Sequence, residues 1–240
     1  MSREEALEHF GIKGMHWGIR KDQDPSNFRL QGADLTVDSR LPSSTKAAGR
    51  EVASLIGERY GFRITSLNAI APGHEEYERG TIGYVQSTPG KMGGSIYVHQ
   101  SDVRKSLKDA EEMDWFAKDC GTVRAFLTHE SAHALFHADQ QVKSGLLGPK
   151  VVGGNIKARD KALKAAMKEV KREGIPPHLF SSKVSGYAKA DGSREELEAE
   201  LFSQYHWSSN PPQFVKVWGE TLHQELGIDS TPFREVVTHV

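Results

Sequence analysis

Apolar residues recur at every third or fourth position over several stretches of the chain, which is the spacing of an amphipathic helix. This pattern predicts helices from Ser44 or Thr45 to about Tyr60, over residues 102–118 and over residues 212–226. In the last of these helices, the apolar face is formed by Phe214, Val217, Trp218 and Leu222. Because such a face is normally buried, we expect these side chains to belong to the core.

Three shorter segments have the composition of strands, namely residues 62–67, 80–86 and 95–99. Glycine-rich turns such as residues 89–94 separate them, as in a hairpin or meander. A few strands combined with a larger number of helices predict an α+β fold class.

The first 45 residues differ in character from the rest of the chain. Residues 1–21 are too few to fold alone, but they are apolar enough to dock on another surface, since glycines alternate there with Phe10, Ile12, Met15, Trp17 and Ile19. Residues 22–45 are polar and contain two proline-serine clusters, as expected of a linker. The one folded domain is therefore expected over residues 46–230.

The composition fits a chain with one sizeable core. Of the 240 residues, 37% are hydrophobic and 26% are charged, and the formal net charge is −1. A nearly neutral chain has no overall attraction to nucleic acid, so a nucleic-acid partner is not expected. The single cysteine, Cys120, excludes an internal disulfide framework.

Targeting signals are not evident in the sequence. The N-terminus is charged and is not followed by the apolar stretch of a secretory signal. No segment approaches the roughly 20 consecutive apolar residues of a membrane span. These features predict a soluble protein that is made in the cytoplasm and has no membrane partner.

The strongest chemical signal is the pattern His-Glu-x-x-His at residues 129–133. On a helix, His129 and His133 lie one turn apart on the same face, where both can bind a single metal ion. Glu130 stands beside them, in the place of a general base. Two imidazoles and an oxygen ligand suit zinc, and a catalytic zinc site leaves its fourth position for a water that becomes nucleophilic.

The residues around this motif are mostly apolar over residues 123–137, with small side chains at Ser131 and Ala132. Such a helix is expected in the core, which is where a zinc peptidase carries its motif. The alternative is an ordinary core helix whose histidines are partly buried and hydrogen-bonded to their neighbours.

A third ligand is needed for a catalytic zinc site, and the best candidates lie downstream. Glu196 and Glu200 are four residues apart, so on a helix their carboxylates face the same side. One of them can bind the metal. The other can accept the ring N–H of a metal-bound histidine and so fix its tautomer.

The two motifs together, His-Glu-x-x-His and then Glu-x-x-Ala-Glu-x-Phe, resemble those of gluzincin-type zinc metallopeptidases, in particular the anthrax-lethal-factor-like group with its phage and toxin relatives. The resemblance extends over about residues 95–215. It implies a zincin-like fold with a small mixed sheet and an active-site helix. It also implies that Glu200 hydrogen-bonds a zinc-bound histidine and that Tyr187 donates to the oxyanion of the tetrahedral intermediate. The zinc ligands by this resemblance are His129, His133 and Glu196.

Three of these assignments have alternatives. Ser193 and Glu196 also fit a capping box, in which the carboxylate only stabilises the start of a helix. Glu198 falls inside the apolar arc of the same helix, where a carboxylate is costly to bury unless it is paired or bound to metal. Glu198 is therefore a rival third ligand. A buried structural role fits Tyr187 nearly as well as a catalytic one.

Two further segments are interpreted with the resemblance in view. In zincins, the strand before the active helix lies at the edge of the sheet and pairs with substrate, and residues 96–98 are the candidate for it. Between the motifs, residues 157–172 predict a helix with an apolar stripe and a lysine-rich opposite face. That face is either a solvated surface or a basic rim that favours acidic partners.

The N-terminal segment has a resemblance of its own. The pattern Phe-Gly-x-Lys-Gly-Met-x-Trp-Gly-x-Arg at residues 10–20 is similar to a segment at the ends of tailed-phage head and virion proteins. The similarity implies a phage-encoded protein in which residues 8–21 dock on capsid or head proteins. The alternative is an N-terminal arm that packs on its own domain.

Taken together, the motifs predict a phage-encoded, zinc-dependent metalloendopeptidase that hydrolyses a protein or peptide substrate in the cytoplasm of the host cell. Two alternatives stay open. One is a virion-associated structural or packaged protein, and the other is an antirestriction or regulatory zincin that acts by binding without proteolysis.

Overall fold

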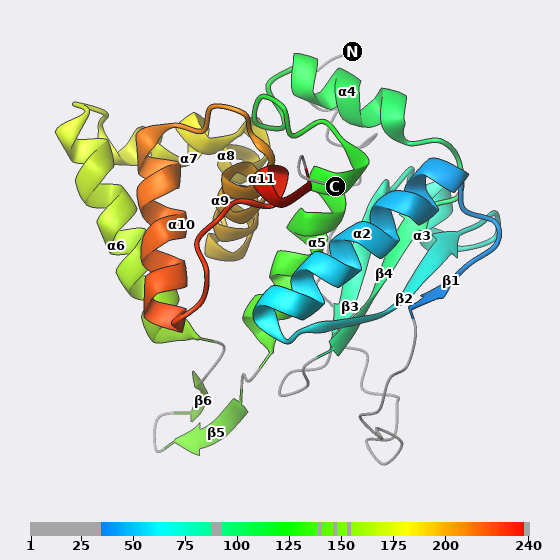
Figure 1. The fold of residues 1–240 in the computed structure, drawn as a ribbon, viewed down its shortest axis with the longest axis horizontal. Coiled ribbons are helices and arrows are strands. Elements are labelled where there is room, and N and C mark those ends of the chain that lie inside the picture. Colours follow the sequence, from blue (N-terminus) through cyan, green and yellow to red (C-terminus); the bar gives the residue numbers. More distant parts are fainter. Residues whose placement is uncertain (1–34, 88–92, 139–140, 146–147, 153–154, 238–240) are drawn as a thin grey trace.

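The computed structural model describes residues 35–87, 93–138, 141–145, 148–152 and 155–237. Residues 1–21, with the predicted docking segment, lie outside these ranges. The described chain has an α+β fold with a small mixed sheet. Helix α5 (Val123–His137) runs between this sheet and a group of helices on its other side (Figure 1).

Four strands form the mixed sheet in the order β1, β2, β4, β3. Their bounds are Thr36–Val37 for β1, Arg63–Ile70 for β2, Gly83–Ser87 for β3 and Gly93–His99 for β4. Strands β1, β2 and β4 are parallel, and β3 pairs antiparallel with β4. The three predicted strands are confirmed, and β1 is an additional strand from within the predicted linker.

The edge of the sheet is not where the sequence analysis placed it. Residues 96–98 lie in β4, which is hydrogen-bonded on both sides, to β2 and to β3. The edge strand next to β4 is β3 instead, and β1 forms the opposite edge. The reason is topological, because β4 returns to pair directly with β2 and leaves β3 outside it.

One face of the sheet is apolar and is covered by α2 (Ser43–Tyr60) and α5. Alternate strand residues point to this face and are buried, namely Ile64, Leu67, Val85, Ile96 and Val98. Helix α5 comes close because Gly83 has no side chain; a Cβ there would lie 2.8 Å from the ring of Phe126. On the opposite face, Tyr84 and Tyr97 stack with their ring centroids 4.7 Å apart.

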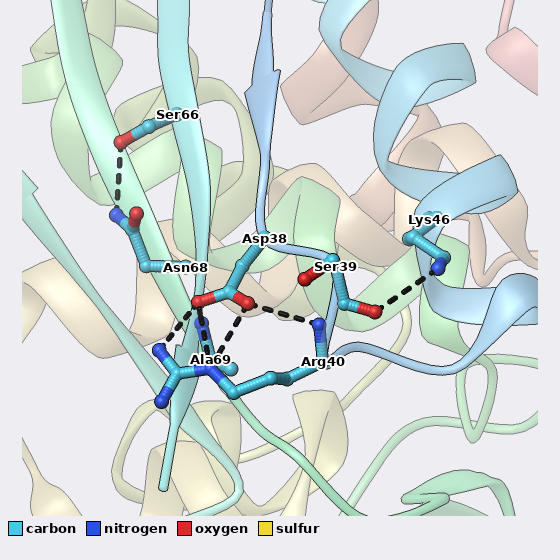
Figure 2. A network of polar contacts seen from close by, with 7 residues as sticks. All are labelled: Asp38, Ser39, Arg40, Lys46, Ser66, Asn68 and Ala69. Atoms are coloured by element: carbon cyan, nitrogen blue, oxygen red, sulfur yellow. Dashed lines mark hydrogen bonds and ion pairs between the residues drawn. The ribbon is translucent and has the colours of Figure 1, made fainter.

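The connection from β1 to α2 is closed by the carboxylate of Asp38 (Figure 2). It accepts hydrogen bonds from the backbone N–H and the side chain of Arg40, and a longer one of 3.4 Å from the backbone N–H of Ala69 in β2. Lys46 in α2 donates to the carbonyl of Ser39, 3.3 Å away (Figure 2). These contacts hold the start of α2 against the end of β2.

The predicted helices are confirmed with shifted ends. Helix α4 (Arg104–Glu112) is shorter than predicted, whereas α6 (Ile156–Arg172) and α10 (Gln213–Leu226) match to within one residue. Helix α2 begins at Ser43, directly after Pro42, one or two residues before the predicted start at Ser44 or Thr45.

Beyond α5, three long helices pack in succession. Helix α9 (Arg194–Trp207) lies against α5, α10 lies against α9, and α6 lies against α10 (Figure 1). Their buried apolar side chains include Leu201 and Phe202 of α9, Trp218 and Leu222 of α10, and Ala162, Ala166 and Val170 of α6.

The remaining elements are short. They are α3 (Glu75–Glu78), the β5–β6 ladder (Gln141–Gly145 with Gly148–Val152), η2 (Pro177–Leu179), α7 (Phe180–Val184), α8 (Gly186–Asp191) and α11 (Phe233–Val237).

The C-terminal segment is fastened to α2 and α9 by polar contacts. The guanidinium of Arg59 donates to the carbonyl of Thr231, and the hydroxyl of Tyr205 donates to the carbonyl of Ser230. The backbone N–H of Phe233 donates to Nδ1 of His206, 3.2 Å away. The segment therefore closes the side of the core that α2, α9 and α10 share.

Within the described part of the chain, every helix is too short or too polar to cross a membrane.

A matched pair of glycine substitutions tests the packing of α9 against α10. A Cβ at Gly219 would overlap the ring of Tyr205, whose hydroxyl is held by Ser230. We expect Gly219→Ala to lower the free energy of unfolding by roughly 1–3 kcal/mol in denaturant titrations, as overpacking does. Gly57→Ala is the control, because its Cβ would meet nothing closer than 3.8 Å in α2.

Gly57→Ala is expected to raise the free energy of unfolding by roughly 0.5–1 kcal/mol, since alanine is the better helix former. Equal effects of the two substitutions would contradict the close approach of the helices at Gly219.

Candidate metal centre

Helix α5 is almost entirely buried, and this burial brings its polar residues into the core. The helix starts at Thr122, whose hydroxyl accepts a hydrogen bond from the backbone N–H of Ala125, 3.2 Å away. Covered by the sheet on one side and α9 on the other, it buries His129, Glu130 and His133 along with its apolar residues. The predicted helix of residues 123–137 is confirmed.

Helix α9 lies antiparallel to α5 and supplies the carboxylates. Its side chains meet those of α5 in reverse order, Glu196 at His133, Glu200 at His129 and, one turn further, Ser203 at Ala125. At the last of these points, the Ser203 hydroxyl donates to the Ala125 carbonyl across 2.8 Å. Because side chains three or four residues apart share a face of a helix, the three contacts between α5 and α9 lie in one row.

Three ligand-type side chains converge in this row, from His129, His133 and Glu196. The two imidazole Nε2 atoms are 3.1 Å apart, and each is 3.2 Å from one oxygen of Glu196. Among the described residues, this is the one group of histidine, cysteine and carboxylate side chains close enough to hold a metal ion, with its ligand atoms within 4.8 Å of one another.

The residues fit a zinc ion. The Glu196 side chain is 1% exposed, and its two oxygens lie 3.2 Å from Nε2 of His129 and Nε2 of His133. A buried carboxylate is unfavourable unless a positive charge compensates it. Two imidazole nitrogens and one carboxylate are the donor set of catalytic zinc sites, so a metal ion would supply that compensation.

Glu200 lies behind His129 rather than in the triad. Its Oε1 is 2.9 Å from Nδ1 of His129, on the side of the ring away from Glu196. A proton on Nδ1 would face this carboxylate, which leaves Nε2 with its lone pair for a metal. The arrangement places Glu200 where the resemblance predicts it.

The charges in the cluster perturb its titration in the metal-free protein. Burial lowers the pKa of His129, but the contacts with Glu196 and Glu200 outweigh burial and raise the pKa well above its usual value. Burial raises the pKa of Glu196, yet the charge of His133 and the contact with His129 hold it below its usual range. The metal-free site therefore carries a protonated imidazole beside a carboxylate.

Glu130 is a buried carboxylate with a nearly neutral pKa. Its Oε2 has no hydrogen-bond partner among the described residues. Burial raises the pKa of Glu130 to about 7, and the nearby His129 limits the rise. A carboxylate that titrates near neutral pH can both accept and return a proton.

Tyr187 lies at the same cluster, from the second residue of α8. Its ring centroid is 5.9 Å from that of His129. Its backbone is held by a neighbouring loop, because the N–H groups of Gly186 and Tyr187 donate to the carbonyls of Asp114 and Trp115 at 2.8 and 3.1 Å. Burial raises the pKa of Tyr187 well above its usual value, so the phenol keeps its proton and remains a hydrogen-bond donor.

The alternatives from the sequence are placed differently. Ser193 does cap α9, accepting from the backbone N–H of Glu196 at 3.1 Å, but the Glu196 side chain points to the histidines and does not complete a capping box. Glu198 is paired with the guanidinium groups of Arg159 and Arg194. The metal cluster of the described residues contains Glu196 and not Glu198.

Sequence reasoning missed the role of Arg159. It belongs to the helix whose basic residues were expected on a solvated surface or a rim, yet it is 3% exposed. The available signal was Glu198, since a carboxylate on an apolar helix face needs a buried cation or a metal.

Comparisons with known proteins bear on the N-terminus alone. A family of unknown function, DUF7211, matches residues 2–24. The matched segment precedes the described residues and contains the predicted docking segment. Searches of curated proteins and of solved structures gave no match.

The metal ligands can be tested against a neighbouring carboxylate. We expect the wild type to bind one equivalent of zinc and Glu196→Gln to lose it, because the amide removes the anionic ligand. Glu195→Gln is the matched control, since Glu195 is the adjacent residue of α9 and is exposed. Elemental analysis after gel filtration measures the bound zinc. Zinc retained by Glu196→Gln would contradict the assigned ligand.

Zinc binding should release protons. Because the metal-free His129 is protonated at neutral pH, a metal ion must displace that proton before Nε2 can bind it. The affinity should therefore rise with pH, by about tenfold per pH unit for each proton released, until the raised pKa is passed. Calorimetric titration in buffers of different ionisation enthalpy counts the protons. An affinity that is flat over this range would contradict the protonated state.

Proposed function

We propose that this protein is a zinc-dependent metalloendopeptidase with a zincin-like fold. The observation that carries the proposal is the convergence of His129, His133 and Glu196, with Glu200 behind His129. The resemblance of both motifs to gluzincin-type peptidases assigns these residues the same roles. The small mixed sheet with an antiparallel edge strand beside the motif helix supports a zincin-like fold.

Each side chain has a defined part in peptide hydrolysis. Zinc at such a site supplies Lewis acidity, which lowers the pKa of water and polarises a carbonyl. His129, His133 and Glu196 hold the ion, and Glu200 keeps His129 in the tautomer that presents Nε2. Glu130 would remove the proton of the attacking water and pass it to the leaving amine, as a carboxylate beside the metal ligands can do.

Tyr187 supplies the remaining polar group. Its burial keeps the phenol protonated, so the hydroxyl can donate a hydrogen bond to the negative oxygen that develops on the attacked carbonyl. The backbone pairing of Gly186 and Tyr187 with residues 114–115 fixes where the ring stands. Gly186 is needed there, because a Cβ would lie 2.6 Å from the carbonyl oxygen of Asp114.

The outer edge of β3, which pairs with no other strand among the described residues, is the candidate site for an extended peptide. The N–H of His99 donates to the carbonyl of Ile82, so residues 82, 84 and 86 point their backbone groups at β4. The backbone groups on the other side are then those of Gly83, Val85 and Ser87, of which Gly83 and Val85 are buried and Ser87 is partly exposed. Because α5 packs under β3, a peptide added to this edge would run alongside the motif helix. This supports a protein or peptide substrate.

The N-terminal segment is a separate part of the proposal. The DUF7211 match is confined to residues 2–24, which supports treating this segment as a module apart from the metal-binding domain. We propose that residues 8–21 dock the enzyme on phage head proteins, so that it acts in the host cytoplasm or in the virion. The alternatives are a packaged protein without proteolysis and a regulatory zincin that acts by binding. Detected peptide cleavage would eliminate both.

Two conservative substitutions test the proposed chemistry. Glu130→Gln should keep its zinc and lose about 10²–10⁴-fold in kcat, because the amide cannot accept a proton. Tyr187→Phe should also keep its zinc and lose about 10²-fold in kcat with little change in KM, as expected of a donor to the oxyanion. Cleavage of a randomised peptide library, followed by mass spectrometry, measures both, with Glu195→Gln as the control.

Cleavage by Glu130→Gln at the wild-type rate would show that the base is assigned wrongly. A zinc-loaded wild type that cleaves no peptide of the library would contradict the peptidase proposal.

A further inference from the structure

Arg159 is a buried cation in the segment that separates the two motifs. It is the fourth residue of α6, and its side chain is 4% exposed. Its Nε donates to Oε2 of Glu198 across 2.8 Å, and Nη2 contacts the same oxygen. Its Nη1 donates to the carbonyl of Phe136 across 3.3 Å, and the guanidinium lies 4.6 Å from the centroid of the Phe136 ring.

Both partners of Arg159 belong to the helices that carry the metal ligands. Phe136 is three residues after His133 in α5, and Glu198 is two residues after Glu196 in α9. A single guanidinium from a third helix therefore contacts α5 and α9 close to the ligand of each. The distance between His133 and Glu196 depends on how these two helix segments sit against one another.

Both carboxylate oxygens of Glu198 are paired with guanidinium groups. Arg159 takes its Oε2, and Nη2 of Arg194 lies 3.0 Å from its Oε1. The same Nη2 lies 2.7 Å from Asp160, which returns the network to α6. Two guanidinium groups and two carboxylates thus form a closed set between α6 and α9, and the buried charge of Glu198 is compensated.

The ion pairs between α6 and α9 are directional, and this distinguishes their effect from that of apolar packing. A buried ion pair can often be replaced by apolar side chains of similar volume without loss of stability, whereas removal of one partner leaves an uncompensated charge. A guanidinium has a planar array of donors that fixes orientation as well as distance. The contribution particular to Arg159 is therefore the relative placement of Glu198 and Phe136.

We propose that Arg159 is a positioning residue of the metal centre, which holds the α9 carboxylate at the spacing from the α5 imidazoles that zinc requires. The inference rests on the proposed zinc site. It also assigns a function to the segment between the motifs. Since Arg159 belongs to α6, the geometry of the metal centre would depend on where α6 lies. Residues that hydrogen-bond a metal ligand directly change metal affinity by about 10–100-fold when they are mutated, and Arg159 acts one contact further out, so we expect an effect at the lower end of that range.

Three variants separate positioning from packing. Arg159→Met removes the charge and the donors. The double substitution Arg159→Met with Glu198→Leu replaces the pair by an apolar one and leaves no uncompensated charge at residue 198. Lys161→Met is the control, because Lys161 is on the same helix and forms an ion pair with Glu225 of α10, 2.5 Å away, instead of contacting α5 or α9.

Two quantities are measured on the full-length protein, which is first stripped of metal and then loaded with zinc or cobalt. The zinc dissociation constant is measured by competition with a chromophoric chelator. The visible absorption of the Co²⁺-loaded protein reports the geometry of the ligands. We expect both Arg159 variants to bind zinc about tenfold more weakly and to show an altered cobalt spectrum, while Lys161→Met matches the wild type in both.

The outcomes that overturn the inference are distinct from those that overturn the metal centre. If the double variant binds zinc as tightly as the wild type with the same cobalt spectrum, Arg159 only fills space and the inference is wrong. The double variant decides the matter even if Arg159→Met alone does not fold. A wild type that binds no zinc would overturn the proposed site itself, and the inference with it, before any variant is compared.

Discussion

The antiparallel contact between α5 and α9 is the interaction on which the rest of the structure depends. Both helices are buried along nearly their whole length, and both present polar side chains to one another at one-turn intervals. Imidazole, carboxylate and hydroxyl groups in such a place are unfavourable unless each finds a partner. The row of contacts from His133–Glu196 through His129–Glu200 to Ala125–Ser203 provides partners for these groups, and a metal ion would lie between Glu196 and the two imidazoles.

The surrounding elements cover this contact on both sides. The sheet and α2 cover the outer side of α5, whereas α10 covers α9 and α6 lies against α10. A second buried polar cluster fastens the C-terminal half of α9. The Tyr60 hydroxyl lies 2.9 Å from Nε2 of His206 and 2.6 Å from Nε2 of His223, and burial lowers the pKa of both histidines.

The direction of the hydrogen bonds in this second cluster follows from its neighbours. Since His206 accepts from Phe233 at Nδ1, its proton is on Nε2 and points to the Tyr60 oxygen. Tyr60 then donates to His223. A neutral, ordered chain of donors thus connects α2, α9 and α10 at a distance from the candidate metal site.

The sequence predicted the parts of this arrangement that follow from local periodicity. The helix of residues 123–137 was visible because it is apolar all round, and the ligand pairs were visible because i and i+4 share a helix face. Nonlocal features were not predictable. The edge position of β3 depends on where β4 inserts, the placement of Tyr187 depends on backbone pairing with a loop some 70 residues earlier, and the burial of Arg159 depends on Glu198 in another helix.

The most direct test of the account is the position of the metal itself. Crystals of the zinc-loaded protein, with diffraction recorded on both sides of the zinc absorption edge, locate the ion without reference to activity. We expect an anomalous peak about 2.0–2.2 Å from Nε2 of His129, Nε2 of His133 and a carboxylate oxygen of Glu196. A peak elsewhere, or these three side chains ordered without a peak between them, would contradict the central claim.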